Sequence, residues 1–152
     1  MKKKPVFGGI ILAMILIIII FGDIINSDNP EQIENDVIVF HVTLADPELY
    51  ENGVYVDYFQ VDKGTYKFVF VPNGDSPQKL SIKLVTESGG SIMDNDFKLE
   101  GNLIEDEISS WYTWEYLGKK KIGFDESKQI KIIVDPNGNY NGPVSIDLIK
   151  LK

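Results

Sequence analysis

An N-terminal apolar run constrains this chain more than any other feature. Residues 6–21 read VFGGIILAMILIIIIF, and Ile24 and Ile25 extend the run past Asp23. About twenty helical residues at ~1.5 Å each reach about 30 Å, the thickness of a hydrocarbon core. In lipid the backbone must satisfy its own hydrogen bonds, which favours a helix even for β-branched isoleucines. We therefore predict a transmembrane signal-anchor helix over residues 1–25, embedded in the membrane through residues 6–25.

The charges beside this run predict its orientation. Lys2, Lys3 and Lys4 precede it, and positive residues favour the cytoplasmic side of a membrane. We expect a single-pass protein of the cell membrane, with a cytoplasmic N-terminus and an extracytoplasmic C-terminal domain.

Two alternatives to an uncleaved anchor stay open. A cleaved secretory signal usually has a shorter apolar region of about 7–15 residues, and Ile20 and Gly22 form a poor small-x-small cleavage pair. A pilin-like signal resembles a basic stretch, a small residue and then an apolar helix, and here the lysines and Gly8-Gly9 precede Ile10 in that manner. Bacterial pilins carry an acid early in that helix, at the place where Met14 stands.

Beyond residue 25 the chain is acidic, and its only basic side chains are lysines. The 22 acids and 12 lysines there leave a net charge of −10, and the whole chain contains no arginine or cysteine. Such a surface argues against nucleic-acid partners, because phosphate recognition relies on excess cationic groups and often on guanidinium forks. Disulfides and thiolate chemistry are excluded.

After a polar linker at residues 26–35, the hydrophobic period becomes two, which is typical of half-buried strands. Residues 36–152 are predicted to form one extracellular domain. Polar and glycine-containing turns separate the predicted strands, which cover residues 36–44, 54–61, 65–71, 80–85, 96–103, 111–117, 119–124, 130–134 and 144–151. Residues 104–110 are expected to form a loop or a helical turn.

About nine short strands without an amphipathic helix favour an all-β fold, namely an antiparallel β-sandwich of jelly-roll or immunoglobulin-like type preceded by the one transmembrane helix. The aromatic-rich segments 54–61 and 65–71 flank Asp62-Lys63-Gly64. Two such segments around a short glycine turn predict a β-hairpin.

Three segments carry a resemblance to small extracellular jelly rolls, including carbohydrate-binding modules and GOLD-type lumenal domains. They are GTYKFVFVPNGDSPQKLSIKL, WYTWEY and IKIIVDPNGNYNGPVSIDL, within residues 37–151. The resemblance implies the sandwich architecture and assigns no functional residue.

The densest aromatic cluster is the first candidate site. On a strand, Tyr112, Trp114 and Tyr116 share one face while Trp111 lies on the other. If that face is exposed, its rings can stack on sugars or contact a protein partner; the alternative is that they fill the core.

A second candidate is a calcium site. Asp135, Asn137 and Asn139 alternate in a glycine-containing loop, as oxygen ligands do in calcium loops. The pattern is incomplete, because Tyr140 stands where glycine is expected, and Asn and Gly also serve tight turns. Calcium is therefore a possible cofactor, and a plain turn is the alternative.

No catalytic constellation is evident. His41 is the only histidine, so a Ser-His-Asp triad or a His-containing zinc site would depend on it; we expect a half-buried strand residue instead. We predict a non-enzymatic binding or structural module with a protein partner, serving as an accessory subunit of a membrane or envelope complex. A pilin-like subunit and a carbohydrate-binding module are the alternatives.

Overall fold

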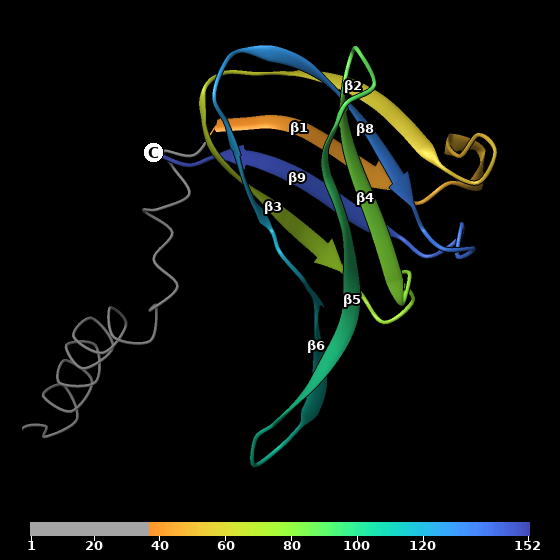
Figure 1. Cartoon of the computed structure of the whole chain (residues 1–152). Coiled ribbons are helices and arrows are strands. Elements are labelled where there is room, and N and C mark those ends of the chain that lie inside the picture. The colour runs from red at the N-terminus through yellow and green to blue at the C-terminus, as the bar shows by residue number, and fades with distance from the viewer. Residues whose placement is uncertain (1–36) are drawn as a thin grey trace, which may run out of the picture. The chain divides into compact units, whose positions relative to one another are not determined.

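The computed structural model describes residues 37–152, and this part of the chain is all-β (Figure 1). Its strands are β1 (Val37–Leu44), β2 (Tyr55–Val61), β3 (Gly64–Pro72), β4 (Lys79–Thr86), β5 (Ser91–Glu105), β6 (Ser110–Leu117), β7 (Lys121–Phe124), β8 (Lys128–Asp135) and β9 (Val144–Lys150). One short 3₁₀ turn, η2 (Pro47–Leu49), follows β1. No helix within residues 37–152 has the length and apolar character to span a membrane. The predicted anchor and linker lie outside the described residues.

The strands form two antiparallel sheets, as expected for a β-sandwich. The four-stranded sheet has the order β1-β9-β3-β7, and the five-stranded sheet has the order β2-β8-β4-β5-β6. Alternate residues of each strand are buried; in β9 these are Val144, Ile146 and Leu148. The period of two in the sequence thus supplies one apolar face per sheet, and these faces enclose a single core.

The predicted hairpin of β2 and β3 is wrong. β2 pairs only with β8, whereas β3 pairs with β7 and β9, so the turn at residues 62–64 joins the two sheets. The Tyr66 side chain explains this corner. Its hydroxyl donates to the Asp62 carbonyl and accepts from the Asp62 amide, each at 3.0 Å. A tyrosine that satisfies the backbone four residues upstream stabilises a change of sheet, as in the tyrosine corners of other sandwiches.

The segment after β4 differs from the expectation in another way. β5 extends through Glu105, where a loop or a helical turn was expected to begin at residue 104, and it pairs with β6 as far as Ser110. Figure 1 shows the distal halves of β5 and β6 projecting beyond the two sheets as a two-stranded ribbon. We call the paired segments of the two strands, residues 98–117, the arm; its base, which includes Tyr116, is packed in the core, and its distal part projects. Cross-strand pairing provides hydrogen-bond partners for the backbone amides and carbonyls of this acidic segment. A helical turn of the same length would leave part of these groups without partners.

Candidate functional site

The aromatic row of β6 passes from the core to the surface. Tyr116 is fully buried and Trp114 is half-buried, whereas Tyr112 is 57% exposed. The Tyr116 hydroxyl donates to the Pro77 carbonyl at 2.6 Å, and burial raises the pKa of this tyrosine. Tyr116 is thus a core residue, so the prediction that it belongs to an exposed platform is wrong. The pattern placed the three rings on one face, but the sandwich ends between Tyr116 and Tyr112.

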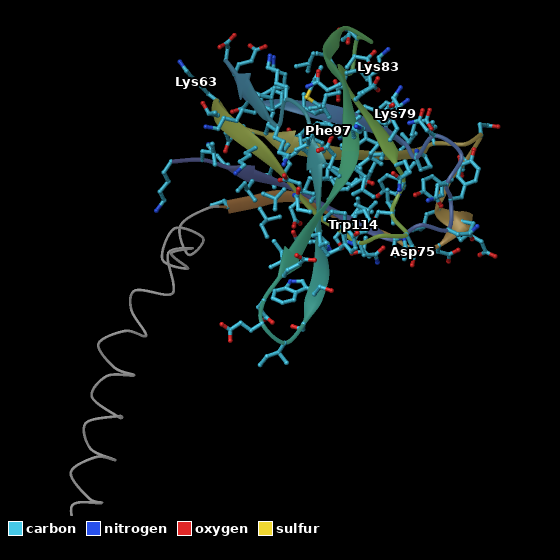
Figure 2. All side chains as sticks on the ribbon, turned by 90° about the horizontal axis from the view of Figure 1, so that it is seen from below. Lys63, Asp75, Lys79, Lys83, Phe97 and Trp114 are labelled. Atoms are coloured by element: carbon cyan, nitrogen blue, oxygen red, sulfur yellow. The ribbon has the colours of Figure 1, made fainter. Side chains whose placement is uncertain are left out.

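Trp114 fastens the arm to the sandwich, and Figure 2 shows its ring at the root of the ribbon. Opposite it on β5 lies Gly101, whose position would bring a Cβ atom within 2.7 Å of the ring. Gly74, in the loop after β3, approaches the ring in the same way at 3.0 Å. Tyr112 stacks on Trp114, with ring centroids 5.7 Å apart and planes inclined by 28°. The two glycines therefore provide the slot that holds this ring.

The tip of the arm is a turn stabilised by Asp106. Its carboxylate accepts the backbone amides of Ile108 at 2.8 Å and Ser109 at 2.7 Å, which lowers the pKa of Asp106. The Asp106 amide in turn donates to the Ser109 carbonyl. This geometry leaves Ile108, at 96% exposed, as the outermost side chain of an ordered turn. An isoleucine held in solvent is unfavourable for an isolated domain, because its apolar surface stays hydrated.

Exposed apolar side chains are concentrated on the arm. Within residues 37–152, six of the thirteen large hydrophobic side chains that are exposed belong to it: Leu103, Ile104, Ile108, Trp111, Tyr112 and Leu117. Exposed apolar side chains gathered on one segment are typical of interaction sites. Sequence analysis singled out the rings but missed Leu103, Ile104 and Ile108. Leu103 is the cross-strand partner of Tyr112, and Ile104 is the partner of Trp111. These pairs depend on the register between β5 and β6, which the sequence alone does not give.

The candidate calcium residues build the loop between β8 and β9. The Asp135 carboxylate accepts the Asn137 amide at 2.7 Å, and Asn137 adopts a positive φ of 50°. The side-chain nitrogen of Asn137 donates to Ser81 Oγ, and Asn139 bridges the Asp75 carbonyl and the Gly142 amide. The structure brings the three residues into one loop and uses them as turn and bridging groups. These contacts fit the plain-turn alternative, and the calcium hypothesis stays untested.

No group of three or more acidic, histidine or cysteine side chains suited to a metal ion occurs within residues 37–152. His41 is 57% exposed rather than half-buried, and its Nδ1 contacts the Asp147 carboxylate on the neighbouring strand. This pair lies on the outer face of the four-stranded sheet, with Thr43 and Ser145 hydrogen-bonded beside it at 2.9 Å. A hydroxyl pair and a histidine–carboxylate pair on an open sheet face are cross-strand contacts of the usual kind.

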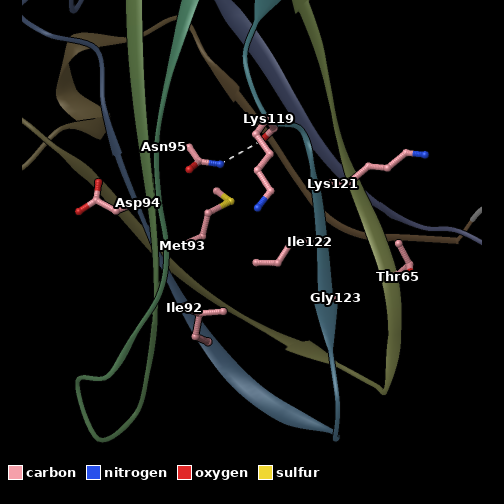
Figure 3. Close-up of a pocket in the computed structure, with 9 residues that line it drawn as sticks. All are labelled: Thr65, Ile92, Met93, Asp94, Asn95, Lys119, Lys121, Ile122 and Gly123. Carbon is pink, nitrogen blue, oxygen red and sulfur yellow. Dashed lines mark hydrogen bonds between the residues drawn. The ribbon is translucent and has the colours of Figure 1, made fainter.

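A cleft of about 450 Å³ opens between β5 and β7, where the edges of the two sheets approach each other (Figure 3). Ile92, Met93 and Ile122 line its apolar side. Asn95 donates to the Lys119 carbonyl at 3.0 Å across the cleft. The Lys119 side chain lies in the cleft and the Lys121 side chain points away from it in Figure 3. The cleft thus holds one cationic side chain, that of Lys119, two residues after the end of the arm.

Together, the fold and the site define an all-β protein of two antiparallel sheets with a projecting apolar arm. Comparison of the chain with protein-family models, curated proteins and solved structures finds no match.

Proposed function

We propose that this chain is a membrane-anchored, extracytoplasmic binding module that presents the arm to a protein partner. The observation that supports the binding role is the concentration of exposed apolar side chains on an ordered ribbon. Aromatic and aliphatic side chains at the centre of an interface supply most of its binding energy. The acidic surface around them favours solubility of the unbound domain.

The strand order supports a more specific description of the sandwich. β1 lies beside β9 and β3 beside β7 in one sheet, while β2-β8-β4-β5 are consecutive in the other. This alternation of successive strands between two sheets is the order expected of a jelly roll with β6 added at one edge. We therefore favour a jelly roll over an immunoglobulin-like sandwich.

The membrane half of the proposal rests on residues 6–25 and is tested by the intact mass of the protein recovered from native membranes. A full-length chain that resists alkaline extraction is the expected result. Loss of about 22–27 residues would identify a released domain, because a signal peptidase cleaves just after the apolar run. Loss of about nine residues would identify a pilin-like subunit, which is cleaved just before that run. Either shortened mass refutes the uncleaved anchor.

The binding half is tested by photo-crosslinking in the native membrane. A photoreactive phenylalanine at Ile108 is expected to give a discrete adduct with another polypeptide. The matched control is the same group at Val71, which is 63% exposed on β3 within the sandwich. Equal adducts from both positions, or none from Ile108, would refute the arm as the binding surface.

A carbohydrate ligand is the alternative favoured by one observation. The Tyr112 ring is exposed and is stacked on Trp114, as in platforms that bind sugars. Binding of a soluble oligosaccharide that is lost in Tyr112→Ala, with no protein adduct at Ile108, would support this alternative.

A further inference from the structure

The outer edge of β6 is an unprotected strand edge. β6 is the last strand of the five-stranded sheet, contains eight residues and pairs with β5 without a register shift. Glu115 is its only charged residue, and it contains no proline. Natural edges are usually shortened, bulged or charged to prevent strand addition. The edge strands of the other sheet follow that rule: β7 has four residues and β1 has an irregular register near Ile38.

The phase of the ladder shows which backbone groups point outward from β6. The Asp106 amide bonds to the Ser109 carbonyl, and the Leu99 amide bonds to Gln78 on the far side of β5. In an antiparallel ladder the bonding direction alternates residue by residue. It follows that the backbone amides and carbonyls of the even-numbered residues of β5 point toward β6, and those of the odd-numbered residues of β6 point toward β5. The amides and carbonyls of Tyr112 and Trp114 face away from the sheet.

We propose that two copies of this chain pair antiparallel through β6, with Thr113 opposite its own symmetry mate. Hydrogen-bonded pairs must join outward-facing residues, so even-numbered residues must face even-numbered residues. Among the registers that satisfy this condition, those centred on Thr113 and on Trp114 each pair seven of the eight residues of β6, 110–116 and 111–117 respectively. The Thr113 register is the one we propose, because it also aligns oppositely charged segments of the two copies. It places Tyr112 opposite Trp114 of the second copy and Glu115 opposite Trp111. Centring the pairing on Glu115 would instead oppose two carboxylates, which is destabilising.

The same register is complementary in charge. Continued past the strand, it brings the acidic turn at residues 105–107 alongside the segment that follows β6 in the second copy. That segment is the lysine run Lys119, Lys120 and Lys121, which makes no ion pair within residues 37–152. Each copy thus offers one acidic and one basic end to a twofold contact, as an isologous interface requires. This complementarity opposes the repulsion expected between two acidic domains.

This inference deepens the proposed function and rests on it, because it names a second copy of the chain as the partner of the arm. Pairing would cover the exposed rings of Trp111 and Tyr112, and the aromatic row of one copy would continue into that of the other. The two sheets would join into one ten-stranded sheet across the dimer, which removes one free edge from each copy.

The test is disulfide trapping in the full chain, which contains no native cysteine. At a non-hydrogen-bonded pair the Cα atoms lie about 4.5 Å apart, within disulfide range. Thr113→Cys is therefore expected to form a covalent dimer under mild oxidation in native membranes. The matched control is Glu115→Cys, which is exposed on the same face of the same strand. Its symmetry mate would lie about 14 Å away along the strand, beyond disulfide reach.

A second variant blocks the edge without breaking the arm. Tyr112→Pro removes an amide that faces outward, so it opposes strand addition while sparing the bonds to β5. We expect this variant to be monomeric by light scattering in detergent, where the parent chain is dimeric, with a melting temperature within a few degrees of the parent. Dimer formation by Thr113→Cys is expected to be lost when Tyr112→Pro is added.

The outcomes separate the two proposals. A monomeric parent with no Thr113→Cys dimer, together with a heterologous adduct at Ile108, overturns self-pairing and leaves the arm as a binding site for another protein. Equal trapping at Thr113 and Glu115 overturns the register and thereby the inference. Failure of every crosslink, including that at Ile108, refutes the proposed function as well.

Discussion

The slot that holds Trp114 gives the sharpest test of how the arm is fixed. We consider Gly101→Ala. The new methyl carbon would lie 2.7 Å, 2.9 Å and 3.0 Å from three atoms of the indole ring. Gly74 bounds the other side of the ring, because a Cβ atom at that position would lie 3.0–3.4 Å from three further ring atoms. A rigid aromatic ring confined in this way must shift together with the backbone around it.

The expected cost follows from this crowding. Overpacking by one carbon against confined neighbours costs about 1–3 kcal/mol. At about 4 °C per kcal/mol for a domain of this size, the melting temperature is expected to fall by roughly 4–12 °C. Without the clash, alanine in place of glycine would favour a strand by about 0.5–1 kcal/mol, because glycine loses more backbone freedom on folding.

A double-mutant cycle isolates the contact. Trp114→Ala alone is expected to destabilise the chain, since it removes a half-buried ring. Adding Gly101→Ala to Trp114→Ala is expected to be neutral or slightly stabilising, so that the sign of the Gly101 effect reverses. The coupling free energy is then about 1–3 kcal/mol. The assay is thermal unfolding of the full chain in detergent, followed by near-ultraviolet circular dichroism.

The matched control is Gly123→Ala on β7, where an added methyl group meets no atom within 4 Å. This substitution is expected to leave the melting temperature unchanged or raise it slightly. A Gly101→Ala variant that melts like the Gly123 control, or that is equally destabilised with and without Trp114, would refute the slot.

Three further predictions follow from other elements. Tyr66→Phe is expected to destabilise the chain by about 1–3 kcal/mol in denaturant unfolding, because it removes both part-buried hydrogen bonds to the Asp62 backbone; an unchanged midpoint would refute the role of the hydroxyl. The lowered pKa of Asp106 predicts that its support of the turn is present above the unfolded-state pKa of about 4 and is lost as the pH falls through the lower folded-state pKa. The protection factor of the Ile108 amide, which is its exchange rate relative to the intrinsic rate at the same pH, is therefore expected to fall in acid in the parent but to show no such pH step in Asp106→Asn. A step in both would assign it to another group. Excess calcium or a chelator is expected to leave the melting temperature unchanged, because one carboxylate oxygen of Asp135 and the side-chain oxygen of Asn139 already accept loop amides; a calcium-dependent rise would support a metal site.

The alternation of apolar residues determined much of the fold. In β9, for example, the strand predicted at residues 144–151 is present, and its alternation places Val144, Ile146 and Leu148 on one buried face. Glycine and asparagine turns also marked where strands end, because few other residues adopt a positive φ. All-β architecture follows from these local rules, which need no knowledge of long-range contacts.

Only the tertiary structure decided which strands pair. The turn after β2 looks like a hairpin locally, yet Tyr66 satisfies the backbone of that corner and β3 joins the other sheet. The aromatic row of β6 likewise has one period throughout, but Tyr116 is buried and Tyr112 is exposed, because the opposing sheet covers only part of the strand. Periodicity determines which residues share a face of a strand. Whether that face is buried in a core or exposed to solvent depends on how far the opposing sheet extends over it. The extent of the opposing sheet is set by contacts between residues distant in the sequence.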